Sequence, residues 1–305
     1  MSKAHRIGLI GLDTSHVEGF TQLLNDPDDP NHVPGGKVVA GFPGGSDDLE
    51  VSCSRVEGFT QKLAGDWGVE IMESPEAVAE ACDLVIITAV DGRVHRDLFE
   101  RTAPFGKPTF IDKPFATDVE DAKAILRLAD ESNVPVMSCS SLRYAENLQA
   151  SLQENSGEAG NIIGCHAYGP MEIQPPLPPL FWYGTHTVEL IVTAMGTGCQ
   201  RVQVVTNEDN DLLTAEWADG RVASIHGLRN QHCQFGITLH RKESAEFIDI
   251  SAVKQPWYAG LLEAIIDSLP EGRSAVQNAE MLEIVRIIEA ANESRATNSP
   301  VVLKA

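Results

Sequence analysis

Short apolar runs alternate with amphipathic segments through the first half of the chain, and this alternation restricts the fold more than any other feature. The runs are rich in β-branched side chains and cover residues 6–11, 37–42, 83–88, 107–112 and 134–138. Apolar residues at helical spacing lie between them, in 14–25, 75–81, 94–102 and 118–132. Strands that are apolar on both faces and alternate with helices form doubly wound parallel sheets. We therefore predict an α/β domain with such a sheet over residues 1–140.

The pattern changes after residue 140. A helix is expected near 141–155, and alternating apolar and polar residues then predict strands at 162–169, 201–206, 212–218, 221–227, 235–240 and 246–251. Such alternation is typical of an antiparallel sheet with one covered face. Helical patterns near 258–268 and 275–294 and a last apolar run at 301–303 complete the chain. We expect residues 141–305 to form an α+β domain with a mainly antiparallel sheet, for substrate binding and self-association.

The charge of the chain restricts its partners. With 23 basic and 44 acidic residues, the formal net charge is −21. Such a surface repels phosphate backbones and anionic lipids, so we expect a small-molecule partner and neither nucleic acid nor membrane. No apolar stretch has the length of a membrane span, and Met1 to Arg6 leads directly into a strand. A cytoplasmic protein is expected.

The cysteines do not suggest a metal site. They lie far apart, without a CxxC pair, at Cys53, Cys82, Cys139, Cys165, Cys199 and Cys233. We expect reduced, mostly buried thiols.

A glycine turn is expected after the first strand of a Rossmann-like domain, and here it is incomplete. Of the glycines in a dinucleotide-binding turn, only Gly11 is present. Asp13 replaces the second glycine, which normally lets the backbone approach a pyrophosphate, so we expect its carboxylate to weaken nucleotide binding. Alternatively, Asp13 or Thr14 caps the following helix.

The end of the second strand lacks the acidic residue that would hold a ribose hydroxyl. Its sequence is Phe42-Pro43-Gly44-Gly45-Ser46. The turn at 44–46 either presents N–H groups to a ribose or a 2′-phosphate, or is an ordinary surface turn. Arg55 is the nearest arginine to this strand end.

The most informative motifs follow the strands at 83–88 and 107–112. Residues 88–95 read TAVDGRVH, Gly106-Lys107-Pro108 comes before the second of these strands, and Asp112-Lys113-Pro114 follows it. Downstream are Arg143-Tyr144 and the run GTHTVE at 184–189. The set resembles the Gfo/Idh/MocA oxidoreductases, which have a TPxxxH turn, a GKP…(E/D)KP element with the active-site lysine, and a GxHxx(D/E) helix. The resemblance covers nearly the whole chain and is densest over 83–144.

The resemblance implies an NAD- or NADP-dependent oxidoreductase of a sugar, polyol or related hydroxy compound, without a metal. Lys113 and His186 would be catalytic. The implied cofactor-binding residues are Gly11, Asp13, Thr14, Ser15, His16, Thr88, Val90, His95, Asp112 and Lys113. The implied substrate-binding residues are Arg143, Tyr144, Tyr183 and Glu189. His95, at a helix start, is expected to pack or cap rather than to catalyse.

The residues themselves place limits on this chemistry. A lysine with its ordinary pKa of about 10.4 is a poor base at neutral pH, so Lys113 must have a lowered pKa or share a proton through a hydrogen bond. Many members of the family carry an aspartate four residues before the helix histidine, where this chain has Trp182.

Two other functions remain open because of Asp13. One is lyase, hydrolase or isomerase chemistry on the same fold, and the other is non-catalytic binding of a metabolite. Self-association is also expected: a strand such as 221–227 carries Val222 and Ile225 on opposite faces, so a homodimer or homotetramer would cover the second face of the sheet.

Overall fold

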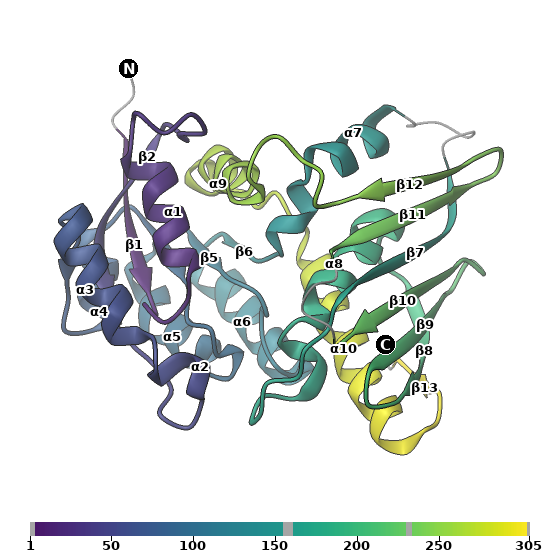
Figure 1. Ribbon diagram of the computed structural model, residues 1–305. Helices are drawn as coiled ribbons and strands as arrows, with labels where there is room; N and C mark the ends of the chain where they lie inside the picture. The colour runs from purple at the N-terminus through teal and green to yellow at the C-terminus, as the bar shows by residue number, and fades with distance from the viewer. Residues whose placement is uncertain (1–3, 155–160, 230–233, 304–305) are drawn as a thin grey trace. The chain divides into compact units, whose positions relative to one another are not determined.

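The computed structural model describes residues 4–154, 161–229 and 234–303. The chain forms two compact units, whose elements are labelled in Figure 1. Unit 1 comprises Met1–Ala116, Glu120–Cys139 and Tyr258–Asn278, and unit 2 comprises Thr117–Val119, Ser140–Trp257 and Ala279–Ala305. This differs from the single predicted division at residue 140, because a later segment returns to unit 1.

Unit 1 is built on a six-stranded parallel sheet in the order β3-β2-β1-β4-β5-β6. The strands are β1 (His5–Ile10), β2 (Gly36–Phe42), β3 (Glu70–Ile71), β4 (Leu84–Ile87), β5 (Thr109–Ile111) and β6 (Val136–Met137). Each predicted apolar run contains one strand, and the predicted doubly wound sheet is confirmed. The strand order reverses between β1 and β4, so the loops after these strands border the crevice in which such sheets bind ligands.

The helices of unit 1 include two that the sequence did not predict. They are α1 (His16–Asn25), α2 (Glu50–Cys53), α3 (Val56–Trp67), α4 (Pro75–Ala81), α5 (His95–Thr102), α6 (Val119–Ser132) and α9 (Trp257–Ser268), with the short 3-10 turns η1 (Gly92–Val94), η2 (Ala103–Phe105) and η6 (Leu269–Glu271). Helix α3 buries only Leu63 and α2 is a single turn. Helix α3 does carry apolar residues at helical spacing, at Val56, Phe59, Leu63 and Trp67, so this pattern was overlooked, whereas a single turn such as α2 is too short to show one.

Helix α9 explains why the chain returns to unit 1. Right-handed crossovers place α1 and α3 on one face of the sheet and α4 and α5 on the other. Helix α9 joins α1: the Tyr258 ring lies 5.2 Å from that of Phe20, and Ile266 packs against Gly36 at the start of β2. The Ser268 hydroxyl reaches Met137 in β6. The helix therefore belongs to the core of unit 1.

Unit 2 contains a seven-stranded sheet in the order β12-β11-β7-β10-β9-β8-β13. Its strands are β7 (Ile162–Pro170), β8 (Cys199–Thr206), β9 (Asn210–Trp217), β10 (Val222–Leu228), β11 (Gly236–Arg241), β12 (Ala245–Asp249) and β13 (Val301–Val302). Strands β7 and β10 pair in parallel and the other neighbours are antiparallel, so the mainly antiparallel sheet is confirmed.

The helices of unit 2 are α7 (Glu146–Glu154), α8 (Gly184–Met195) and α10 (Asn278–Thr297), with 3-10 turns η3 (Ser141–Tyr144) and η5 (Pro179–Phe181). The helix expected from residue 141 begins as η3 and continues as α7, and residue 155 lies outside the described residues. Helix α8 packs on β7 and β10. Ile225 is fully buried and Val222 is 48 % exposed, as expected for opposite faces of β10.

Within residues 4–154, 161–229 and 234–303, none of the helices is both long and apolar enough for a membrane crossing. Within the same residues, no cluster of three or more His, Cys, Asp or Glu side chains suits a metal ion. Cys53 is exposed, the other four described cysteines are buried, and Cys233 lies outside the described residues.

The turn after β1 depends on the missing side chain of Gly11. Its φ is +94°, and a Cβ there would lie 2.4 Å from the backbone of Ala89. We expect Gly11→Ala to lower the free energy of unfolding by on the order of 3 kcal/mol, from strain and overpacking. Urea unfolding followed by circular dichroism measures this.

Gly65→Ala is the matched control for Gly11→Ala. Gly65 is exposed on α3, and a Cβ there would meet no atom within 4 Å. This variant should be unchanged or more stable by up to about 1 kcal/mol, because alanine favours helix. Equal effects of the two substitutions would contradict the tight approach of Gly11 to Ala89.

Candidate functional site

The turns after β1 and β2 are joined by backbone hydrogen bonds. The Gly11 N–H donates to the Phe42 carbonyl at 2.9 Å, and the Leu12 N–H donates to the Pro43 carbonyl at 2.7 Å. Gly44 lies against this turn, since a Cβ there would be 3.4 Å from the Gly11 Cα. Gly11 is therefore the tight-turn glycine that the sequence predicted, and the turn after β2 packs on it.

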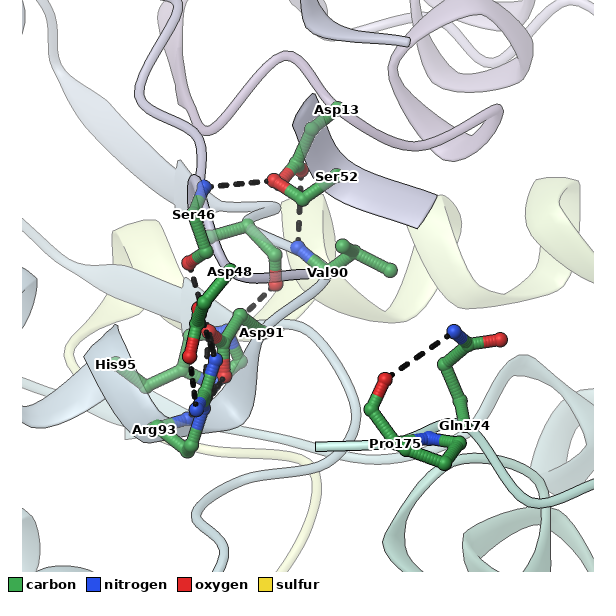
Figure 2. Close-up of polar contacts among 11 residues, drawn as sticks. Asp13, Ser46, Asp48, Ser52, Val90, Asp91, Arg93, His95, Gln174 and Pro175 are labelled. Atoms are coloured by element: carbon green, nitrogen blue, oxygen red, sulfur yellow. Dashed lines mark hydrogen bonds and ion pairs between the residues drawn. The ribbon is translucent and has the colours of Figure 1, made fainter. Parts of the chain in front are cut away.

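Asp13 directs its carboxylate into unit 1. One oxygen accepts a hydrogen bond from the Ser52 hydroxyl at 2.6 Å, the other accepts the Val90 N–H at 2.9 Å, and the residue is 1 % exposed (Figure 2). Burial raises the pKa of Asp13, while these two hydrogen bonds and the charge of Arg55 oppose the rise. The carboxylate thus connects α2 and the loop after β4 to the turn after β1.

This geometry bears on both predictions for Asp13. Both carboxylate oxygens have protein partners, Ser52 and Val90, and the expected effect of this residue on a nucleotide stays a prediction. For the predicted cap, α1 begins at His16 after Ser15, whose side chain makes no capping bond. The Thr14 hydroxyl accepts the His16 N–H at a long 3.4 Å.

The turn at 44–46 is also part of this protein network. The Ser46 N–H donates to the Ser52 hydroxyl oxygen at 2.8 Å, and the Ser46 hydroxyl donates to Asp91 at 2.7 Å. Of the N–H groups in this turn, that of Ser46 therefore already has an acceptor within the protein, which favours the alternative of an ordinary turn at this residue. Arg55, the arginine nearest β2, bonds the Val51 carbonyl through Nε.

The loop after β4 supports the glycine turn from within the protein. The Thr88 hydroxyl donates to the Gly11 carbonyl at 2.7 Å. His95 is fully buried, with Nε2 2.7 Å from the Ala89 carbonyl and Nδ1 3.4 Å from that of Phe115. The expectation that His95 packs rather than catalyses is consistent with this burial. Its assignment as a cofactor contact stays a prediction, and each ring nitrogen lies near a backbone carbonyl of the protein.

Lys113, Asp112 and His16 form a charged cluster in unit 1. Asp112 follows β5 and accepts the Lys113 backbone N–H at 2.8 Å through one oxygen, while the other contacts His16 Nδ1. Asp112 and Lys113 are 4 % and 8 % exposed. The His16 ring also lies 4.9 Å from that of Tyr258 on α9.

Burial acts differently on the two ionisable groups of this pair. Burial lowers the pKa of Lys113. The charge of Asp112 acts to raise this pKa, whereas the charge of Arg55 lowers it further. For Asp112, burial acts to raise the pKa, but His16 and Lys113 outweigh it and hold the pKa below its usual value. The cluster therefore combines an ionised carboxylate with an amine that loses its proton more easily than an ordinary lysine.

His186 belongs to unit 2, on the first turn of α8. Its Nδ1 lies 2.7 Å from the Ser140 hydroxyl, and its ring contacts those of Tyr183 and Phe235 at 5.6 and 5.4 Å. Ser140 also accepts the Leu142 N–H at 3.2 Å, which fixes it at the start of η3. The histidine is thus oriented by a serine and two aromatic rings.

Three predicted substrate residues have different surroundings in unit 2. Arg143 donates to Glu189 at 2.5 Å and to Glu280 at 3.0 Å. Glu189 also accepts the Ser140 N–H at 3.1 Å; burial raises its pKa, and the charge of Arg143 opposes the rise. Arg143 and Glu189 therefore hold η3 against α8, and their assignment to substrate stays a prediction. Tyr144 ends η3 half-buried.

Sequence reasoning missed residues that orient the predicted ones. Ser52 and Ser140 hold Asp13 and His186, and Tyr258 packs on His16 from a segment more than two hundred positions away. Ser140 immediately precedes a predicted element, as a capping residue does. Nothing in the local sequence marks Ser52 or Tyr258.

The buried bonds of Asp13 predict its effect on stability. Asp13→Ala leaves the Val90 N–H and the Ser52 hydroxyl without this acceptor, and each such loss costs about 1–3 kcal/mol. Asp13→Asn, which keeps one acceptor, should lose less. Urea unfolding at a series of pH values measures both; a wild-type midpoint for Asp13→Ala would contradict the role of this carboxylate.

The pH dependence of the Asp13 variants has a definite sign. Because the folded pKa is raised above its ordinary 3.8, the native state holds this proton more tightly than the unfolded chain. The stability advantage of the wild type over Asp13→Asn should be largest at acidic pH and shrink as pH rises through the window above 3.8.

Comparisons with known proteins show which family and which solved structures the chain is similar to. Residues 39–139 match the model of the Gfo/Idh/MocA oxidoreductase family, NAD-binding Rossmann fold. The inositol 2-dehydrogenase of Rhizobium meliloti (strain 1021) is 32 % identical over 106 residues, which are 33 % of this chain and 32 % of that protein. The alignment thus spans about a third of the curated relative.

Solved structures share the fold over nearly the whole chain. GenD2 from gentamicin A biosynthesis, in complex with NAD, has a TM-score of 0.80 at 15 % identity and covers 100 % of this chain and 98 % of its own. The myo-inositol dehydrogenase of Lactobacillus casei, in complex with NAD(H) and myo-inositol, has a TM-score of 0.75 at 16 % identity, covering 99 % and 98 %. The chain therefore resembles the Gfo/Idh/MocA oxidoreductase family over residues 39–139, from β2 to β6, and shares its fold with these solved structures over nearly its whole length.

Proposed function

We propose that the chain is a nicotinamide-dependent dehydrogenase that oxidises a hydroxyl group of a sugar or polyol, with an inositol as the first substrate to test. The observation that carries the proposal is Lys113, a buried lysine beside an ionised aspartate at the carboxyl end of β5. It lies within the family match, and the relatives named above include inositol dehydrogenases.

The turns of unit 1 fit a dinucleotide. Gly11 takes the left-handed backbone conformation of a tight turn, and the Asp13 carboxylate is directed at Ser52 and Val90. These two bonds fix the position of the Asp13 carboxylate, and the start of α1 that follows it is the kind of place where phosphates bind. The residues that would hold the cofactor are those of the turn 11–16 and the loop 88–90.

The proposed proton transfer belongs to unit 1. A bound nicotinamide would supply the hydride acceptor. Lys113 takes the proton of the substrate hydroxyl. Its lowered pKa favours this step, and the charge of the neighbouring Asp112 carboxylate limits how far that pKa falls. Within unit 2, His186 is proposed by itself as a group that binds a hydroxyl, and Ser140 sets the direction of its ring.

Replacing Lys113 tests this assignment. Lys113→Ala should lower turnover by about 10²–10⁴-fold, the usual contribution of a proton-transfer group. The assay is NADH formation from a panel of inositols and sugars, with Lys123→Ala, an exposed lysine on α6, as control. In the wild type, turnover should rise with pH through a pKa below the ordinary lysine value, because the base must lose its proton. Wild-type turnover in Lys113→Ala would disprove the role.

We also propose that unit 2 mediates self-association as a homodimer or homotetramer. One face of its sheet carries exposed apolar side chains from separate strands: Val205, Leu212, Val222, Phe247 and Val302. Residues that are paired across neighbouring strands lie on the same face of a sheet. These apolar residues therefore lie on one face of the sheet of unit 2, together with the polar side chains between them. Burial of this face between copies would remove it from water.

Light scattering tests the association. The protein should have a mass of at least twice 33.0 kDa, and Leu212→Asp should shift it toward the monomer. Phe105→Asp, which alters an exposed aromatic residue of unit 1, should leave the mass unchanged. A wild-type monomer at micromolar concentration would rule the proposal out.

A further inference from the structure

The turn between β4 and α5 is longer than the motif it resembles. Thr88 and His95 lie seven positions apart, against five in TPxxxH. This turn includes η1, where the Asp91 carboxylate accepts the Arg93 N–H at 3.0 Å. It therefore contains an aspartate and an arginine that bond each other.

These two residues bond the turn after β2 (Figure 2). The Arg93 guanidinium donates to Asp91 from Nε and Nη2 at 2.9 and 2.8 Å, and to Asp48 from Nη1 and Nη2 at 2.9 and 2.8 Å. The Ser46 hydroxyl donates to the same Asp91 at 2.7 Å. The loop after β4 thus reaches past the end of β1 to the loop after β2.

The position of this network in the sheet indicates a role in cofactor binding. Strands β2 and β4 flank β1 in the sheet, so the network lies at the carboxyl ends that a dinucleotide follows. In doubly wound folds, an acidic residue after the second strand accepts the ribose 2′-hydroxyl, whereas an arginine there accommodates a 2′-phosphate. In this chain no acidic residue directly follows β2. Asp48, six positions after Phe42, and Arg93, from the loop after β4, are the acidic and basic side chains nearest to these roles, and the bonds between them decide which one meets a ligand.

The charges of the network do not balance. Two carboxylates, Asp48 and Asp91, share one guanidinium. Burial acts to raise the pKa of Asp91, but the bonds from Arg93 and Ser46 outweigh it and hold the pKa below its usual value, so this 1 % exposed group is an anion. The Asp48 carboxylate is 63 % exposed. An incoming ligand therefore meets an accessible carboxylate and an arginine engaged on three of its nitrogens.

We propose that Asp48, Asp91 and Arg93 select NAD over NADP. The inference rests on the proposed function, since it requires a nicotinamide dinucleotide in unit 1. Asp48 accepts hydrogen bonds from the free ribose hydroxyls of NAD. A 2′-phosphate, with a charge of about −2 at neutral pH, would meet the excess carboxylate while Arg93 is held by Asp48 and Asp91.

The test is a fluorescence titration of the full-length protein with NADH and with NADPH at one fixed salt concentration. The expected dissociation constant for NADH is at least about tenfold below that for NADPH, equivalent to about 1.4 kcal/mol. Binding is the readout, so no substrate is needed.

Two substitutions should move this ratio in opposite directions. Asp48→Asn removes one negative charge and releases donors of Arg93 toward a phosphate, so the preference for NADH should fall by about tenfold. Arg93→Gln leaves both carboxylates without their cation, so the preference should rise. Asp219→Asn removes the same charge from an aspartate–arginine pair of unit 2 and should leave the ratio unchanged.

The outcomes separate this inference from the proposed function. Opposite shifts in the two variants, with an unchanged control, support the inference. Equal binding of NADH and NADPH, or a ratio that neither variant changes, overturns it while the dehydrogenase proposal stands. Failure of the wild type to bind either nucleotide overturns both.

Discussion

The buried carboxylate of Asp13 holds together segments that the parallel sheet alone leaves separate. A strand order fixes which loops are neighbours, but it does not fix their conformations. Asp13 bonds a backbone N–H after β4 and a serine of α2 simultaneously, and the same serine accepts the backbone N–H of Ser46. Three loops at the carboxyl edge of the sheet are therefore positioned by one acidic side chain and one hydroxyl.

This arrangement gives Asp13, which replaces the second glycine of the motif, a structural role in the protein. A carboxylate in place of the second glycine is an obstacle to phosphate only where it faces the start of α1. Once its oxygens are directed inward, the residue becomes a support for the loops that border the crevice. A glycine at this position would give the backbone more conformational freedom, whereas the aspartate fixes the neighbouring loops through its hydrogen bonds.

Much of the architecture was predictable from sequence because it depends on local patterns. Apolar runs with β-branched residues marked the buried strands, and alternation marked the second sheet, so the fold class followed directly. Helix α2 was missed because a single turn shows no periodicity, whereas α3 was overlooked although Val56, Phe59, Leu63 and Trp67 recur at helical spacing.

The candidate site was predictable only in part, for a related reason. Motif positions indicated Lys113 and His186 as candidates, but not the side chains that orient them. Ser140 and Tyr258, which orient His186 and His16, come from distant segments, and a sequence pattern does not reveal which protein groups Asp13, Arg143 and Glu189 bond. Such choices depend on tertiary packing, which a linear pattern does not contain.

The return of α9 to unit 1 has a consequence for how the protein is made. Ribosomal synthesis releases the chain from its N-terminus, and domains generally fold as they emerge. Unit 1 gains its last core helix only when residues 258–278 appear, after almost all of unit 2. Until then, Phe20 and the glycines at the start of β2 lack the side chains that cover them. The nascent first unit therefore carries an uncovered apolar surface through most of translation, and its folding is completed only together with that of its neighbour.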